Sequence, residues 1–267
     1  MSFSAAWLEL REPYDRRARN AAVIDAVVAA FAGRPSVTIA DLASGTGSTF
    51  RALKPWIKAR QSWRLADNDL SLLARAPQSS PPDIHVTTIP IDLNRDLEAA
   101  LDGPVDLVTT SALLDLVSDE WLQRLAVETA ARRLPVYAAL SYDGRIEMTP
   151  ADAVDKKIIA AVNKHQRTDK GFGPALGPEA AQKAVVRFER VGYSVLQGPS
   201  DWMFAPQDRE IQNEILAGWA AAAREIGDMP LPDVVGWLKR RHDMVAAGRS
   251  SIRVGHVDFF ARPTGTR

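Results

Sequence analysis

The sequence contains no cysteine among its 267 residues, and this absence excludes several kinds of chemistry. A chain without thiols forms no disulfide, offers no thiolate nucleophile and builds no cysteine-based zinc site. The four histidines do not form a metal-binding spacing such as H-E-x-x-H. We therefore expect a protein that works without a resident metal ion.

An excess of charge of one sign is missing as well. The 33 basic residues balance the 33 acidic residues, so the formal net charge is zero. Such a chain lacks the excess of basic residues that is typical of nucleic-acid-binding proteins. We expect no nucleic-acid partner.

Long hydrophobic runs are the third absence. No stretch reaches the eighteen or more apolar residues of a membrane-spanning helix, and the opening segment MSFSAAWLELREPYDRR carries charges too early for a signal peptide. Hydrophobic residues still make up 46% of the chain, which is an ordinary share for a globular protein with a core. The expectation is a cytoplasmic protein with no membrane partner.

Short apolar runs alternate with helical patterns along the chain. The strand-like runs cover residues 36–43, 62–69, 85–93, 104–114, 134–144, 193–198 and 252–263. Helical patterns stand between most of them, and the first 33 residues read as a helix that is interrupted near Pro13. Strands that alternate with helices predict βαβ units and a parallel sheet, so the fold class is α/β.

The segment TIADLASGTGSTFRAL joins the first strand to a helix through a turn rich in small residues. In such a turn, backbone N–H groups can approach a polar or anionic ligand at the N-terminus of the helix. Gly45 and Gly47 are present, but Phe50 occupies the third glycine position of the dinucleotide fingerprint G-x-G-x-x-G. The turn indicates a nucleotide-like ligand other than a dinucleotide, with an ordinary structural turn as the alternative.

The order Asp41, Ala43, Gly45 and Gly47 resembles the first motif of class I S-adenosylmethionine-dependent methyltransferases. The sequence departs from that motif at Ala43, where the family usually has its first glycine. The resemblance implies that this turn, with Ser44 in it, binds S-adenosyl-L-methionine as cofactor.

Two further acids end the second and third strands. Asp67 stands where nucleotide-binding folds place an acid on the ribose hydroxyls, and we count Asn68 beside it as a candidate. The alternative for this segment is a helix cap, for which Asp69 is better suited. The resemblance implies that Asp92 and Leu93 lie at the adenine.

The methionine end of the cofactor is expected at the exit of the fourth strand. The resemblance implies contacts from Ser111 and Ala112, and it directs Tyr14 and Arg19 of the N-terminal segment toward the cofactor's carboxylate. An exposed, salt-bridged face explains Arg19 equally well.

The fold that the resemblance implies is a Rossmann-like, mostly parallel seven-stranded sheet with helices on both faces. Its last strand is expected to be antiparallel beside the sixth. Residues 1–267 then form a single domain with an N-terminal helical cover, a cofactor-binding core and two helical insertions that cover the acceptor side. These parts span residues 1–33, 36–143, 145–178 and 205–250.

The candidate catalytic residues come from the part of the chain that is expected to bind the methyl acceptor, at the exit of the fifth strand and after it. Tyr142 and Asp143 stand at the exit of the fifth strand, and His165 precedes a Gly/Pro-rich loop and could act as a general base. A histidine that interacts with the helix dipole is the alternative for His165. Asp115 is a candidate for facing the acceptor, with a surface acid as the alternative.

The sequence thus predicts methyl transfer from S-adenosylmethionine to a small-molecule acceptor by in-line displacement, in a monomer or homodimer. Two alternatives use the same sheet. An NAD(P)-dependent oxidoreductase would need the third glycine that is missing, and a non-catalytic S-adenosylmethionine-binding protein would lack an acceptor pocket.

Overall fold

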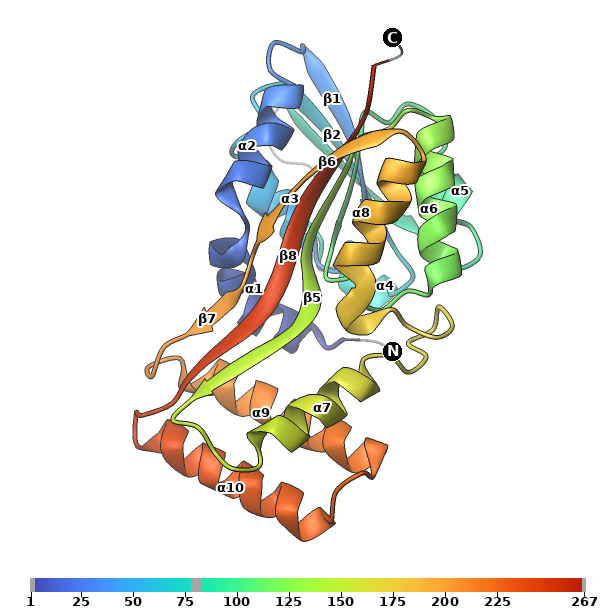
Figure 1. The fold of residues 1–267 in the computed structure, drawn as a ribbon. Helices are drawn as coiled ribbons and strands as arrows, with labels where there is room; N and C mark the ends of the chain where they lie inside the picture. The colour runs from blue at the N-terminus through green and yellow to red at the C-terminus, as the bar shows by residue number, and fades with distance from the viewer. Residues whose placement is uncertain (1–2, 78–82, 266–267) are drawn as a thin grey trace.

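The computed structural model describes residues 3–77 and 83–265, and an eight-stranded sheet runs through the molecule (Figure 1). The strand order is β3-β2-β1-β4-β5-β8-β6, and β7 pairs with β8 beside this path. The strands are β1 (Ser36–Leu42), β2 (Arg60–Asp67), β3 (Ile84–Pro90), β4 (Leu107–Ser111), β5 (Val136–Thr149), β6 (Tyr193–Pro199), β7 (Trp202–Phe204) and β8 (Ser251–Pro263).

The pairing of the strands confirms the predicted topology. The first five strands are parallel to their neighbours, whereas β8 is antiparallel to β5, β6 and β7. β8 lies beside β6, as the resemblance implied for the last strand, and its other neighbour on the path is β5. The eighth strand, β7, was not predicted, because three residues are too few to show an alternating pattern. It forms where β5 and β8 extend beyond β6, and it pairs with β8 there.

Helices cover both faces of the sheet (Figure 1). One face packs against α2 and α3, and the other packs against α5, α6 and α8. The helices are α1 (Ala5–Ala18), α2 (Ala21–Ala30), α3 (Ser48–Leu53), α4 (Leu70–Leu73), α5 (Leu97–Ala100), α6 (Asp119–Ala131), α7 (Asp155–His165), α8 (Ala180–Arg190), α9 (Arg209–Ile226) and α10 (Leu231–Ala246).

The first 33 residues form two helices, but the break is not at the predicted place. Pro13 lies inside α1, and the chain breaks at Arg19 and Asn20. The side chain of Asn20 accepts a hydrogen bond from Val23 N (3.1 Å), and the backbone N–H of Asn20 donates to Asp258 (3.0 Å). This N-cap starts α2 in a new direction, which explains the position of the break.

Helices α7, α9 and α10 gather around the extended ends of β5 and β8, and we call them the insertion cluster (Figure 1). They come from the two segments that we predicted as acceptor-side insertions. Their apolar residues form a core with Tyr142, Ile146, Ile252 and Val254 of the two strands. Helix α1 packs against this core as well, so it lies between the insertion cluster and the turn after β1.

Candidate functional site

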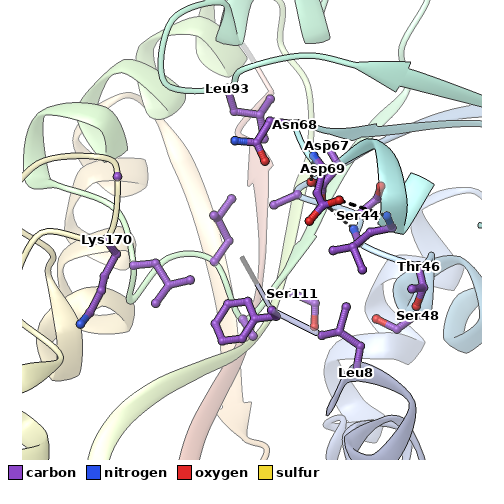
Figure 2. A pocket seen from close by; sticks show the side chains of 18 of the residues that line it. Leu8, Ser44, Thr46, Ser48, Asp67, Asn68, Asp69, Leu93, Ser111 and Lys170 are labelled. Carbon is purple, nitrogen blue, oxygen red and sulfur yellow. Dashed lines mark hydrogen bonds between the residues drawn. The ribbon is translucent and has the colours of Figure 1, made fainter. Parts of the chain in front are cut away.

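A cavity of about 190 Å³ lies at the carboxyl ends of the parallel strands (Figure 2). Open α/β sheets bind ligands in this position. Nine of the thirteen residues predicted to bind the cofactor line it, and they are Ala43, Ser44, Gly45, Asp67, Asn68, Asp92, Leu93, Ser111 and Ala112. The structure therefore brings the ends of four strands to one space.

The turn after β1 is formed by residues in the left-handed region of backbone conformation. Ala43 has a φ of 52°, Gly45 of 53° and Gly47 of 83°. A Cβ added to Gly47 would lie 2.9 Å from Pro77, so this glycine is required for space as well as for φ. Gly47 does not line the cavity. Ala43 holds the same backbone at a cost of about 1 kcal/mol, which its surroundings must offset.

Asp41 lies beneath this turn and does not line the cavity. It is fully buried, and its Oδ1 accepts a hydrogen bond from Thr109 (2.7 Å). Burial raises the pKa of this carboxyl to about 7. Its Oδ2 has no hydrogen-bond partner within the described part of the chain, and the same is true of the buried Ser44 hydroxyl.

The carboxylate of Asp67 is held in place by two backbone N–H groups and can accept further hydrogen bonds. Its Oδ2 accepts from Gly45 N (2.7 Å) and its Oδ1 from Asp69 N (2.9 Å). Each carboxylate oxygen can accept a further bond, which suits a ligand with two adjacent hydroxyls. The helix cap falls to Asp69 as expected, because its carboxylate accepts from Ser71 N (2.9 Å) and Leu72 N (3.2 Å).

The third strand end is covered by a loop from the first insertion. Leu93 O accepts a hydrogen bond from the indole of Trp121 (2.8 Å), and the ring of Phe172 packs edge-on against that indole at 5.5 Å. Asn94 donates to Gly171 O (3.0 Å). Gly171 and Phe172 consequently line the cavity next to Asp92 and Leu93, within the segment 145–178 that we predicted on the acceptor side, although neither residue was singled out.

One face of α1 covers the other side of the cavity. Leu8, Arg11 and Asp15 line it, and their spacing of three and four residues is that of one helix face. Phe3, just before the helix, lines it too. The helix is held in place by ion pairing of Glu12 with Arg51 (2.5 Å). Sequence reasoning selected this segment but chose other residues in it.

Tyr14 and Arg19, the residues selected in that segment, do not line the cavity. The Tyr14 hydroxyl donates to Asp208 (3.0 Å), away from the cavity lining. Arg19 is buried and donates to the Tyr137 hydroxyl (3.2 Å) and to the Ser111 hydroxyl (3.3 Å). Arg19 thus contacts a lining residue from behind, and contact of either side chain with a cofactor stays a prediction.

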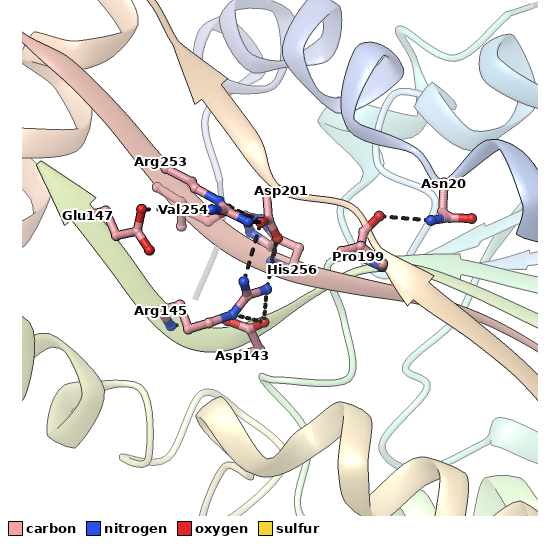
Figure 3. A network of polar contacts seen from close by, with 9 residues as sticks. All are labelled: Asn20, Asp143, Arg145, Glu147, Pro199, Asp201, Arg253, Val254 and His256. Atoms are coloured by element: carbon pink, nitrogen blue, oxygen red, sulfur yellow. Dashed lines mark hydrogen bonds and ion pairs between the residues drawn. The ribbon is translucent and has the colours of Figure 1, made fainter.

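The three candidate catalytic residues also lie outside the cavity lining. His165 faces Glu225 (Nε2–Oε2, 2.9 Å) and Lys170 (Nδ1–Nζ, 3.3 Å). The Tyr142 hydroxyl donates to Asn163 (2.7 Å). Asp143 belongs to a network of ion pairs with Arg145, Asp201 and Arg253 (Figure 3). Each therefore has protein partners, and a catalytic role for them stays a prediction.

Asp115 lies next to lining residues without being one of them. Leu113 and Leu116 line the cavity on either side of it, and Asp115 itself is buried. Burial raises the pKa of its carboxyl to about 6, and its Oδ1 has no hydrogen-bond partner among the described residues. A carboxyl in this state can take up or release a proton near neutral pH.

The chemistry of the lining fits an adenosyl group bonded to an amino acid. Asp67 offers a carboxylate to a diol, and Leu72, Ile91 and Leu93 offer apolar contacts for a ring system. The unpartnered Ser44 hydroxyl offers a hydrogen bond to a polar tail. In the described residues no group of three or more histidine and acidic side chains is placed to hold a metal ion. No helix in that part of the chain is long and apolar enough to span a membrane.

Comparison with solved structures shows the same fold. A cyclopropane-fatty-acyl-phospholipid synthase-like protein from Lactobacillus casei superposes with a TM-score of 0.52 at 15% identity, covering 94% of this chain and 99% of that one. Loganic acid methyltransferase with SAH superposes with a TM-score of 0.53 at 11% identity, covering 99% and 97%. No protein-family model matches the sequence, and no curated protein matches it significantly. The chain has the Rossmann-like fold of methyltransferases that the sequence resemblance implied.

Proposed function

We propose that this protein transfers the methyl group of S-adenosyl-L-methionine to a small-molecule acceptor. The observation that carries the proposal is the meeting of four strand ends in one cavity, each with the residue types that the sequence motifs predicted. The shared fold supports it, since neighbours of this fold include a methyltransferase with SAH.

Each strand end has a role in this proposal. Asp67 and Asn68 hold the ribose, Asp92 and Leu93 lie at the adenine, and the segments Ala43–Gly45 and Ser111–Ala112 enclose the methionine part. The cofactor, when bound, supplies a methyl group that its sulfonium already activates. The chain must then align the acceptor and exclude water, and the residues of α1 and Phe172 that line the cavity are placed to do this.

The proposal favours a small acceptor over a macromolecule. The cavity is covered by α1 on one side and by the loop with Gly171 and Phe172 on another. Such a covered space admits a compact molecule. The zero net charge also gives no support for a nucleic-acid substrate.

Calorimetric titration with S-adenosylhomocysteine and with NAD tests the cofactor assignment. We expect micromolar or tighter binding of the first and no binding of the second. Asp67→Asn should weaken binding about tenfold or more, because an amide replaces one charged acceptor of the ribose hydroxyls. Asp25→Asn, at an exposed position of α2, is the matched control and should bind normally.

Two results would overturn the proposal. Binding of NAD without S-adenosylhomocysteine would point to the oxidoreductase alternative, despite Phe50 filling the third glycine position inside the core. Binding of the cofactor with no room for an acceptor in a co-crystal structure would point to a non-catalytic binding protein.

A further inference from the structure

Arg11 is a cation of the cavity lining whose terminal nitrogens are free. Its Nε donates to Asp15 (2.9 Å), and this is the one hydrogen bond that Arg11 donates from its side chain to a described residue. The other cation of the lining, Lys170, is already engaged with Thr168 (2.9 Å) and His165. Figure 2 shows the end of the Lys170 side chain turned away from the cavity.

The Arg11 guanidinium is held in one orientation by its surroundings. It lies over the Trp202 ring, with its central carbon 5.0 Å from the ring centroid. Asp15, which accepts from Arg11, also accepts from the Trp202 indole (2.9 Å). The three side chains therefore fix one another, and the side chain of Arg11 is only 11% exposed. A fixed guanidinium with a free end is suited to bind a carboxylate through two parallel hydrogen bonds.

The neighbours of Arg11 place its terminal amino groups on the side of the cavity that faces away from the glycine turn, where we expect the acceptor. On α1, Leu8 is the residue that approaches the glycine turn, since a Cβ on Gly45 would lie 3.3 Å from it. Arg11 is nearly one helical turn further along. Its positive charge acts on Asp115, beyond the exit of β4, and on His256 of β8. Burial lowers the pKa of His256 to about 3, so this neighbour is neutral and does not compete for an anion.

We propose that Arg11 binds a carboxylate of the acceptor, which makes the methyl acceptor a small organic acid. This inference rests on the proposed function, because only a methyl-transferring enzyme has a methyl acceptor. The binding of a carboxylate by Arg11 can be tested independently of that function. The bond would anchor the acceptor between α1 and the exit of β4, with the apolar side chains of Leu113, Leu116 and Phe172 beside it.

The test uses benzoate as an anionic probe and benzamide as its neutral counterpart. Binding to the full-length protein is followed by NMR titration, with and without saturating S-adenosylhomocysteine. We expect benzoate to bind about tenfold or more tightly than benzamide, and Arg11→Gln to remove that preference. Arg16→Gln, an exposed position on the same helix with the same change of charge, should keep it.

A second arm distinguishes the acceptor's carboxylate from that of the cofactor. We expect Arg11→Gln to bind S-adenosylhomocysteine within about threefold of the unmodified protein. If Arg11→Gln instead loses affinity for S-adenosylhomocysteine but not for 5′-methylthioadenosine, which lacks the amino acid part, Arg11 serves the cofactor and the inference is wrong.

Other outcomes are equally decisive. Unchanged benzoate affinity in Arg11→Gln, or no benzoate binding by the unmodified protein, would overturn the carboxylate site. Should Arg11→Gln fail to fold in a thermal unfolding control, Arg11→Lys takes its place, because it keeps the charge and loses the paired donors. Failure of the unmodified protein to bind S-adenosylhomocysteine would count against the proposed function alone, since benzoate is also titrated in its absence.

Discussion

Carboxylates are buried both near the cavity and in the insertion cluster, but the two regions differ in the partners that these carboxylates have. In the insertion cluster, Asp155 accepts from the Trp237 indole (2.8 Å) and forms a buried ion pair with Arg241. Near the cavity, Asp41 lies beneath the turn after β1 and has one oxygen without a hydrogen-bond partner in the described residues, and Asp67, which lines the cavity, is bonded to two backbone N–H groups. In the described residues neither Asp41 nor Asp67 forms an ion pair with a cation of the chain.

This difference separates a structural acid from a binding acid. A buried carboxylate with a full set of donors and a cation stabilises the packing around it only as long as the partner stays. A carboxylate that keeps unused lone pairs is costly to bury, and where it lines the cavity, as Asp67 does, a ligand can satisfy it. The following predictions test this distinction, from the largest expected effect to the smallest.

Removing the cation of the insertion cluster should have the largest effect on stability. Arg241 is fully buried, so Arg241→Ala leaves Asp155 charged without its partner and should lower the free energy of unfolding by about 3–5 kcal/mol. Urea unfolding of the variant and of the unmodified protein measures this loss of free energy. The neighbouring Arg240, about half exposed and paired with Asp152, is the control, and Arg240→Ala should cost less than about 1 kcal/mol. Equal losses in the two variants would contradict the comparison.

Asp41 should make the protein less stable as the pH rises. Its pKa is about 7 in the folded protein and 3.8 as a free group, so the folded state holds the proton more tightly. Its contribution to stability is therefore full below pH 3.8 and is lost as the pH rises to about 7. Asp41→Asn cannot ionise, and it should gain more than about 1 kcal/mol relative to the unmodified protein between pH 4 and pH 8.

The measurement is urea unfolding of both proteins at several pH values. The difference between the two isolates Asp41, because Asp115 and the other titrating groups are common to both. A difference that does not change with pH would show that the buried Asp41 carboxyl has an ordinary pKa.

Ala43→Gly should stabilise the turn of the cavity slightly. Ala43 has a φ of 52°, where glycine has no steric penalty, and we expect a gain of up to about 1 kcal/mol. Ala160→Gly, at an exposed position inside α7, should instead lose about 1 kcal/mol. Thermal unfolding compares the two substitutions, and a loss at both positions would show that the methyl group of Ala43 is needed for packing.

The smallest effect is expected for Asp143→Asn. This acid pairs with Arg145, whose side chain is 47% exposed, and such pairs contribute less than about 1 kcal/mol. Because Asp143 does not line the cavity, the variant should bind S-adenosylhomocysteine with unchanged affinity in calorimetry. A marked loss of that affinity would show that the ion-pair network of Figure 3 reaches the cavity.

The predictions from the sequence were most successful for residues at the ends of the parallel strands. Asp67, Asp92 and Ser111 each stand at or just beyond the end of a parallel strand, and parallel strands end at the same edge of a sheet. Their convergence on one cavity could be predicted without any knowledge of side-chain packing. The antiparallel last strand followed from the resemblance in the same way.

The sequence resemblance predicted that the N-terminal segment and the insertions cover the cavity, but it did not predict which of their residues line it. The face of α1 with Leu8 and Arg11 meets the cavity because the opposite side of the helix packs on the insertion cluster, through residues such as Leu10 and Tyr14. The loop with Phe172 reaches the cavity because Phe172 packs on Trp121, fifty-one positions earlier in the chain. Both depend on contacts between distant segments.

By itself, then, the sequence predicted the α/β fold class, nine residues that line the cavity and the absence of cysteine chemistry, because these follow from composition, from local periodicity and from residues at strand ends. Only the tertiary structure decided which polar groups outside the strand ends face the cavity and which are already bonded within the protein. It placed His165, Tyr142 and Asp143 among protein partners, and it left the terminal amino groups of Arg11 without a hydrogen bond to any described residue, while Nε donates to Asp15. The physical reason is that hydrogen-bond satisfaction depends on neighbours brought together by packing, which no local pattern records.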